Sequence, residues 1–319
     1  MNMKPNGCPI GRLVAGALIV LGFVLSFYAA FLFRPTASGR SVSHLAQSTR
    51  QPSGAICRPG DLNQDKVRLG KLLFNDVRLS GDGTRSCASC HDLASNGALD
   101  GKRETSLDTP TVFNVVLNYR FGWTGSFTSL EAQALATIES PLMARGASPQ
   151  VAYRRIAADR ALSHAFDRVY GQAPSRETIA DALAEFERSL VTPSRFDRWL
   201  EGDEDALTER EQRGYHAFVR LGCQSCHQGR GLGGNLMQRH GIFRPLASPQ
   251  PAIVRVPGLR NVAETAPYFH DGSAATLEEA IRKMASSQLN RDLSSAEIRL
   301  LAEFLASLTG TYEGERVHR

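Results

Sequence analysis

The sequence lacks the features of several common protein classes. It has no basic stretch with interleaved aromatic residues, so nucleic-acid binding is not expected. Its charge is nearly balanced, because 37 Lys and Arg against 32 Asp and Glu give a net charge of +5 over 319 residues. Long alternating strand patterns are also missing, and apolar residues recur at helical spacing instead, as in the run from Ile179 to Leu190. The sequence therefore predicts an all-α protein with extensive loops.

One long uncharged apolar run lies near the N-terminus, from Leu13 to Phe33. It is long enough to cross a hydrocarbon core of about 30 Å as a helix. Lys4 and Arg12 precede it, so the positive-inside tendency puts the N-terminus in the cytoplasm and the rest of the chain on the periplasmic side. Because the run exceeds the roughly 7–15 apolar residues of a signal peptide, an uncleaved transmembrane helix is favoured over a removed signal.

Composition divides the rest of the chain. Residues 1–34 hold the anchor, and residues 35–60 are rich in Ser, Pro, Gly and Thr, as flexible linkers are. The globular part begins near Asp61. In its last third, Thr276–Glu279 and Ser294–Glu297 each have the pattern of a helix capping box, which predicts two helix starts.

The strongest motif occurs twice, as Cys87-Ala-Ser-Cys90-His91 and Cys223-Gln-Ser-Cys226-His227. Two thiols at this spacing can each form a thioether to a haem vinyl group, and the adjoining His then ligates the iron. A zinc ribbon would need the two Cys pairs about 15–20 residues apart, and these pairs lie much farther apart. A thioredoxin-like redox pair would need a βαβ setting, which the periodicity does not offer. The two occurrences of the motif therefore predict two covalently bound haems c. No other strict repeat is visible in the sequence.

Several further segments resemble one known family. They are Gly70–Ser80, Thr109–Asn114, Leu190–Pro193, Pro257–Val262 and Tyr268–Gly272. Together with the two motifs, they are similar to the bacterial di-haem cytochrome c peroxidases, which include MauG-type oxidases. The resemblance implies two cytochrome c-like domains, a peroxidatic one at 61–205 and an electron-transfer one at 206–310, followed by a tail at 311–319.

The resemblance also implies roles for single residues. Met284 matches a distal thioether ligand of the second haem and is preferred as that ligand, although its helical spacing from Leu277 and Ile281 is also that of a core position. MauG-type members carry Tyr there. Trp123 matches a tryptophan between the two haems, where a buried core Trp is the alternative. The first haem is expected to be open, since Asp92–Asp108 contains no His.

For the distal side of the first haem, the resemblance implies a Gln and a Glu that assist O–O cleavage. Gln133 matches the first, but Met143 stands where the Glu is expected. Glu139 is the nearest candidate to replace that acid, with a solvated helix charge as the alternative. The family also binds Ca²⁺ between its domains, and Asp108, Thr265 and Pro267 match those positions.

Three functions follow from these observations. The first is reduction of hydrogen peroxide with electrons from a small cytochrome c or cupredoxin that docks near the second haem. The second is a MauG-type oxidation of a partner protein's side chain, against which Met284 argues. The third is a non-enzymatic electron carrier or redox sensor, which Met143 keeps open. A homodimer is one assembly that these functions allow.

Overall fold

The computed structural model describes residues 54–56, 60–99 and 107–319, which lie in one compact unit. The predicted anchor at 1–34 lies outside these residues. In the part of the chain that the structure describes, no helix is both long and apolar enough to span a membrane.

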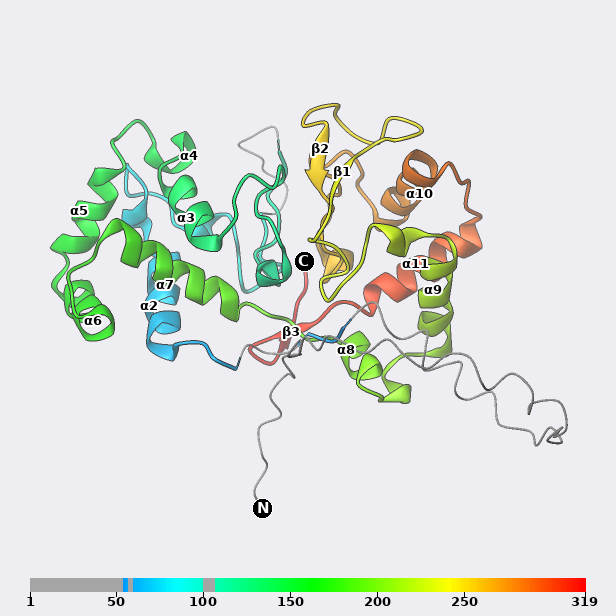
Figure 1. Ribbon diagram of the computed structural model, residues 1–319, viewed down its shortest axis with the longest axis horizontal. Coiled ribbons are helices and arrows are strands. Elements are labelled where there is room, and N and C mark those ends of the chain that lie inside the picture. Colours follow the sequence, from blue (N-terminus) through cyan, green and yellow to red (C-terminus); the bar gives the residue numbers. More distant parts are fainter. Residues whose placement is uncertain (1–53, 57–59, 100–106) are drawn as a thin grey trace, which may run out of the picture. The chain divides into compact units, whose positions relative to one another are not determined.

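Helices dominate the described residues, as predicted (Figure 1). The α-helices are α2 (Gln64–Phe74), α3 (Leu130–Ile138), α4 (Pro141–Ala144), α5 (Gln150–Ala158), α6 (Arg160–Tyr170), α7 (Arg176–Ser189), α8 (Arg195–Leu200), α9 (Glu209–Arg220), α10 (Leu277–Leu289) and α11 (Ser295–Ala306). Short 3₁₀ helices are η1 (Val77–Leu79), η2 (Cys87–Ser89), η3 (Val115–Leu117), η4 (Glu204–Ala206), η5 (Cys223–Ser225) and η6 (Val262–Glu264). Two antiparallel pairs complete the fold, β1 (Met237–Arg239) with β2 (Ile253–Arg255) and β3 (Thr311–Tyr312) with β4 (Glu315–Arg316).

Two main hydrophobic clusters form the core. The first is built from residues between Leu69 and Leu190 together with Val317. The second is built from residues between Phe196 and Leu308. Each contains one of the predicted apolar helix faces, because such a face is stable only when it packs against another element. The two clusters are what two haem-binding halves need, although the exact boundary at 205/206 stays a prediction.

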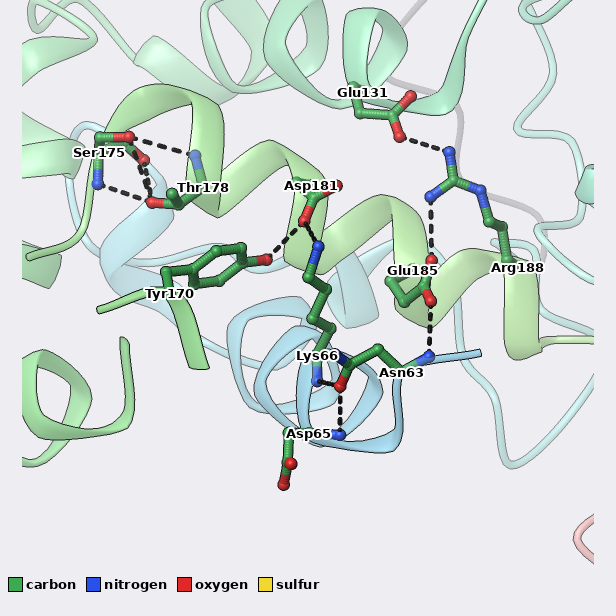
Figure 2. Close-up of polar contacts among 10 residues, drawn as sticks. All are labelled: Asn63, Asp65, Lys66, Glu131, Tyr170, Ser175, Thr178, Asp181, Glu185 and Arg188. Carbon is green, nitrogen blue, oxygen red and sulfur yellow. Dashed lines mark hydrogen bonds and ion pairs between the residues drawn. The ribbon is translucent and has the colours of Figure 1, made fainter. Parts of the chain in front are cut away.

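Polar contacts fix α7 against α2 and α3 in the first half (Figure 2). Asp181 of α7 accepts from Lys66 of α2 and from the Tyr170 hydroxyl, both at 2.7 Å. Arg188, near the end of α7, is paired with Glu131 of α3. These contacts hold the solvent side of α7, so its opposite side faces the interior.

The two halves repeat one structural pattern. In each, a glycine lets two helices cross closely: a Cβ on Gly70 would lie 2.0 Å from Ala182 O, and one on Gly214 would lie 2.3 Å from Leu300 O. In each, a phenylalanine lies beside the motif histidine, with ring centroids 6.5 Å apart for Phe74–His91 and 6.4 Å apart for Phe218–His227. Helix α2 crosses α7 in the first half, and α9 crosses α11 in the second. Helix α2 therefore corresponds to α9, and α7 corresponds to α11.

A second stretch repeats without insertion, residues 110–137 and 257–284. Asn114 and Asn261 both adopt left-handed backbone, with φ of 61° and 62°, and each begins a 3₁₀ helix. The bridge Phe121–Phe127 corresponds to the bridge Tyr268–Ala274. The helices that follow, α3 and α10, therefore correspond residue by residue. This repeat is not evident in the sequence, because few of its paired residues are identical.

Both predicted helix starts are present. Ser294 and Glu297 form a full capping box. Thr276 accepts the Glu279 N–H, while the Glu279 carboxylate takes the N–H of Ala275. Two segments are more ordered than expected: Ile56, in the predicted linker, is buried and donates to Asp197, and Val317, in the predicted tail, is buried in the first cluster. Apolar side chains explain both, since burying them is favourable.

Candidate functional site

The two Cys-x-x-Cys-His motifs have the same local geometry. Each begins a 3₁₀ turn, η2 or η5, directly before its histidine. His91 Nδ1 lies 3.0 Å from Gly97 O, and His227 Nδ1 lies 3.3 Å from Leu232 O. Burial lowers the pKa of both imidazoles, so each is neutral. A neutral ring that donates through Nδ1 presents Nε2 to a metal, which is the form that an iron-ligating His takes.

The motif cysteines are partly buried beside these histidines. Burial raises the pKa of the Cys87 thiol to about 12 and that of Cys223 to about 11. Such thiols are protonated and weakly reactive toward oxidants. Their environment suits thioether attachment points better than a redox-active pair.

A large apolar cavity opens beside the second motif. It holds about 1290 Å³ of empty space, its open mouth included. Cys223, Cys226 and His227 line it, as do apolar side chains of α10 and α11. A mostly apolar wall with a few polar groups fits a flat porphyrin. The residues therefore fit the cofactor that the motif predicts.

Met284 lines this same cavity from α10, together with His227. Leu277 and Ile281 line it as well and also pack against the second cluster, whereas Met284 is not part of that cluster. The alternative of a simple core methionine is thereby weakened. The ligand role of Met284 stays a prediction that its position supports.

At the first motif, the structural repeat identifies the corresponding distal residues. Thr137 of α3 corresponds to Met284, and Gln133 corresponds to Ala280. The Thr137 hydroxyl donates to Gln133 O at 2.9 Å. Threonine is not an axial ligand of haem iron in proteins of this type. The first half thus has no counterpart of the Met284 thioether at this position.

Gln133 and Met143 lie on the distal elements α3 and α4. The Gln133 side-chain oxygen is buried and has no hydrogen-bond partner. A buried polar atom without a partner is costly in a folded protein and marks a place where a bound molecule can supply one. Met143 is 5% exposed and belongs to the first cluster, so no acid occupies that position.

Glu139 ends α3 and is held in an ion pair. Arg176 contacts its carboxylate at 2.6 and 3.1 Å, and the Tyr153 hydroxyl donates to it at 3.0 Å. The hydrogen bonds from Arg176 are the main reason that the pKa of Glu139 lies below its usual value. Glu139 is therefore a carboxylate at neutral pH, which weighs against it as a proton donor. Its catalytic role stays a prediction.

Trp123 connects the two halves. Its Nε1–H donates to Asp108 O at 2.8 Å, and its ring meets the buried His270 ring edge-on at a centroid distance of 6.3 Å. The centroids of the His270 and His240 rings lie 4.7 Å apart. The rings of Trp123, His270 and His240 all line the cavity beside the second motif, the second cavity. Trp123 and His270 are corresponding residues of the repeat. The position suits the relay, which stays a prediction.

The calcium assignment also stays a prediction. Asp108 donates its N–H to His270 O at 2.7 Å, and a cis peptide bond precedes Pro267. Thr265 donates its hydroxyl to Val262 O. Within the described ranges, no group of three or more His, Cys, Asp or Glu side chains could hold a metal ion.

Sequence reasoning overlooked Glu187 of α7. It is a partly buried carboxyl whose pKa is raised to about 8, mainly because burial disfavours its charge. The structural repeat reveals it, because Leu305 occupies the corresponding position in α11.

Comparison with known proteins agrees with this geometry. Residues 64–205 match the family model described as di-haem cytochrome c peroxidase. The chain is 38% identical over 271 residues to a cytochrome c551 peroxidase of Nitrosomonas europaea, covering 78% of this chain and 81% of that protein. It is 32% identical to the methylamine utilization protein MauG of Methylorubrum extorquens, covering 86% and 84%.

Solved structures agree as well. A crystal structure of a MauG-like protein associated with microbial copper homeostasis superposes with a TM-score of 0.69 at 28% identity, covering 81% of this chain and 93% of that one. Membership implies two haems c, which the two motifs and the apolar cavity fit. The chain belongs to the di-haem cytochrome c peroxidase and MauG family of oxidoreductases.

Proposed function

We propose that the protein reduces hydrogen peroxide with electrons delivered by a small redox protein. The observation that carries this proposal is the difference between the two halves at one repeated position. Met284 lines the second cavity with His227, whereas Thr137 occupies the corresponding position of the first half. His227 and Met284 would thus both be able to hold an iron in the second half, whereas His91 would have no such counterpart at position 137 in the first half.

In the second half, His227 and Met284 would hold the iron. A thioether ligand raises the reduction potential of a haem, which suits the entry of electrons. Trp123 and His270 line the same cavity and lead toward Asp108 of the first half. These residues give an electron a route made of aromatic rings and hydrogen bonds.

In the first half, His91 and the thiols of Cys87 and Cys90 would hold the cofactor. A bound haem supplies the iron that binds a peroxide oxygen and exchanges electrons with it. Gln133 offers its unpaired side-chain oxygen as an acceptor for a peroxide O–H. The overall reaction consumes two electrons and two protons for each peroxide and releases two molecules of water.

The surface next to α10 fits a redox partner. Ile242 and Phe243 are 50% and 58% exposed, and their N–H groups bond to Gln288 and to Ser287 O on α10, the helix of Met284. Arg239 and Arg244 flank the pair and are also exposed. We propose that this face receives a small soluble cytochrome c or cupredoxin with an apolar contact patch and an acidic rim.

Exchanging Phe243 for serine should raise the KM for the donor and leave kcat nearly unchanged, because an apolar contact is lost. High salt should also raise the KM of the native chain, because it screens the charges of Arg239 and Arg244. Tyr119→Ser is the control, since Tyr119 is 73% exposed and lies on the first half. Equal effects of both substitutions would reject this face as the docking site.

The central test is peroxide consumption with a reduced donor, combined with the spectrum of the half-reduced protein. In Met284→Ala, the second haem should lose its thioether signature and its potential should fall, because iron loses a soft ligand. Donor-driven turnover should then drop, while peroxide still reacts with the fully reduced protein. Unchanged spectra would return Met284 to a packing role, and no turnover in the native chain would reject the peroxidase function.

A MauG-type oxidation of a partner side chain is the second candidate. The likeness to MauG and to a MauG-like protein favours it. Met284 argues against it, because the resemblance places Tyr at this position in MauG-type members.

We also propose that the protein lies on the periplasmic side of the inner membrane, held there by the segment Leu13–Phe33. Fractionation of cells that express the full chain tests it, and recovery in the cytoplasm would reject it.

A further inference from the structure

Helix α11 forms one wall of the cavity beside the second motif. In the second half, Leu301 and Leu305 of α11 line the cavity. Helix α7 corresponds to α11, because Ala182 and Leu300 meet the paired glycines and Phe186 and Phe304 follow them at the same spacing. Phe186 meets Phe74 at 5.3 Å, as Phe304 meets Phe218 at 5.3 Å. Glu187 therefore occupies, in the first half, the position of a cavity-lining leucine.

Glu187 differs from the other charged residues of its helix. Asp181, Glu185 and Arg188 all have ion-pair or hydrogen-bond partners (Figure 2). Among the described residues, no hydrogen bond or ion pair reaches the Glu187 carboxyl. A carboxyl kept in a partly buried wall without a partner is costly, so a structural role does not account for it.

The first motif lies within electrostatic reach of this carboxyl. After burial, the negative charge of Glu187 is the largest factor that raises the pKa of the Cys87 thiol. Cys87 would form a thioether, so Glu187 lies close to the edge of the site that holds the first haem. A charge so near, and poorly screened, interacts strongly with the charge of the iron.

The charged groups that act on Glu187 lie on α7 and α3. Arg188 follows it on α7 and lowers its pKa, while Glu131 of α3 raises it. These two are paired with each other. On α2, Lys66 is paired with Asp181 and Lys71 with Glu313. Desolvation outweighs these charges, and the pKa of about 8 puts the proton equilibrium close to neutral pH.

We propose that Glu187 is a redox-linked proton site of the first haem. Its carboxylate binds one proton when that haem gains one electron, and its carboxylic acid releases the proton when the electron leaves. Reduction removes one positive charge from the site, which favours the neutral acid over the carboxylate. The inference rests on the proposed function, in which each electron must be matched by a proton, and Glu187 stores one of them inside the protein.

The test is the reduction potential of the first haem as a function of pH, measured by spectroelectrochemistry on the haem-loaded full chain. For the native chain, we expect the potential to fall between about pH 6 and 9, with a slope approaching ~59 mV for each tenfold change in proton concentration. In Glu187→Gln, which keeps the shape and removes the acid, this slope should fall to less than a third. A flat native profile, or an unchanged slope in the variant, would overturn the proposal.

Two further variants test whether the slope depends on a carboxyl at this place in the wall or on any carboxylate of the helix. Glu177→Gln removes an exposed carboxylate from the same helix and should leave the slope unchanged. Leu305→Glu places a carboxyl in the corresponding wall of the second half and should give the second haem a new pH dependence. A slope lost equally in Glu177→Gln would show that general surface charge, and not Glu187, is the cause.

A second measurement uses the native chain alone and therefore still tests the proposal if a variant fails to fold. Infrared difference spectra of the native chain, reduced minus oxidised, should contain the C=O band of one newly protonated carboxyl, and its absence would overturn the proposal. Neither measurement needs peroxide. A chain that binds both haems and shows the linkage without consuming peroxide would therefore reject the proposed function and retain the role of Glu187.

Discussion

Three pairs of corresponding residues make the two haem sites unequal. Thr137 replaces Met284, and Gln133 replaces Ala280, on helices that otherwise match in position. Glu187 replaces Leu305 on the wall helix. In each pair, the first half has the residue that can hydrogen-bond or carry a proton, and the second has an apolar or thioether group. A site that binds peroxide needs the former, and a site that only passes electrons is better kept dry.

The missing acid leads to the first residue-scale prediction. Met143→Glu should raise the rate of peroxide cleavage by about 10²-fold, because it restores a proton donor on the distal element α4. Glu139→Gln should change the rate by less than about twofold, since its ion pair with Arg176 already keeps it a carboxylate. Rapid mixing of the reduced protein with peroxide measures both rates.

Met143→Gln is the matched control, because it has the size and polarity of Glu without the acid. If Glu139→Gln instead slows cleavage by about 10²-fold or more with both haem spectra intact, Glu139 is the acid after all. An increase in Met143→Gln equal to that in Met143→Glu would assign the effect to polarity.

Sequence alone could identify residues whose chemistry is tied to a fixed local spacing. The motif cysteines, His91 and His227 are of this kind, and Met284 could be proposed from its place after a recognisable segment. Glu187 could not, because its neighbours Ile179–Phe186 form an ordinary amphipathic helix. Only the packing of α7 against α2 shows which side of that helix faces the site.

At the scale of elements, each half depends on one close helix crossing. Gly70 of α2 approaches α7 so closely that a Cβ would lie 2.0 Å from Ala182 O and 2.6 Å from the Phe186 Cβ. Neither atom can move freely, since one is backbone and the other is a buried core residue. The crossing fixes α7 and, with it, the wall that carries Glu187.

Gly70→Ala should therefore lower the free energy of unfolding by about 1–3 kcal/mol, the usual cost of overpacking a core. Urea denaturation of the haem-loaded chain, followed by circular dichroism, measures it. Gly60→Ala is the control, because no atom lies within 4 Å of its added Cβ and its φ is outside the left-handed region. Equal stability of the two variants would show that α2 can shift away from α7 without cost.

Elements were predictable where their apolar periodicity is strong. The faces of α7 and α11 and the two capped starts of α10 and α11 follow from the sequence. The short pairs β1–β2 and β3–β4 do not, because strands of two or three residues have too few positions for an alternating pattern. Their pairing depends on tertiary contacts, such as that of Tyr312 with Phe113 at 5.1 Å.

At the scale of the whole described unit, buried polar contacts join the halves. The Thr192 hydroxyl accepts from Asn114 at 2.7 Å and from Asn261 at 2.9 Å, the two left-handed asparagines of the repeat. Nearby, Arg260 and Asp197 form an ion pair with both side chains under 5% exposed. Breaking this buried pair would leave an uncompensated charge, so it fixes α8 within the second cluster, and the Thr192 contacts hold the halves at a fixed spacing. A fixed spacing is what electron transfer between two sites requires.

Trp123 lies between the two halves and contacts residues of both. It contacts Asp108 through Nε1 and His270 through its ring, and it lines the second cavity. Trp123→Phe keeps an aromatic ring but removes the Nε1 hydrogen bond, so electron transfer from the second haem to the first should slow by about tenfold or more, a barrier increase of roughly 1.4 kcal/mol or more. Stopped-flow spectra of the half-reduced protein mixed with peroxide follow both haems separately.

The matched control is Trp199→Phe, because Trp199 is 3% exposed in the second cluster and packs against Phe196 instead of lining the cavity. A transfer rate that falls equally in both variants would mean that tryptophan loss loosens the fold, and an unchanged rate in Trp123→Phe would leave Trp123 a packing residue between the halves.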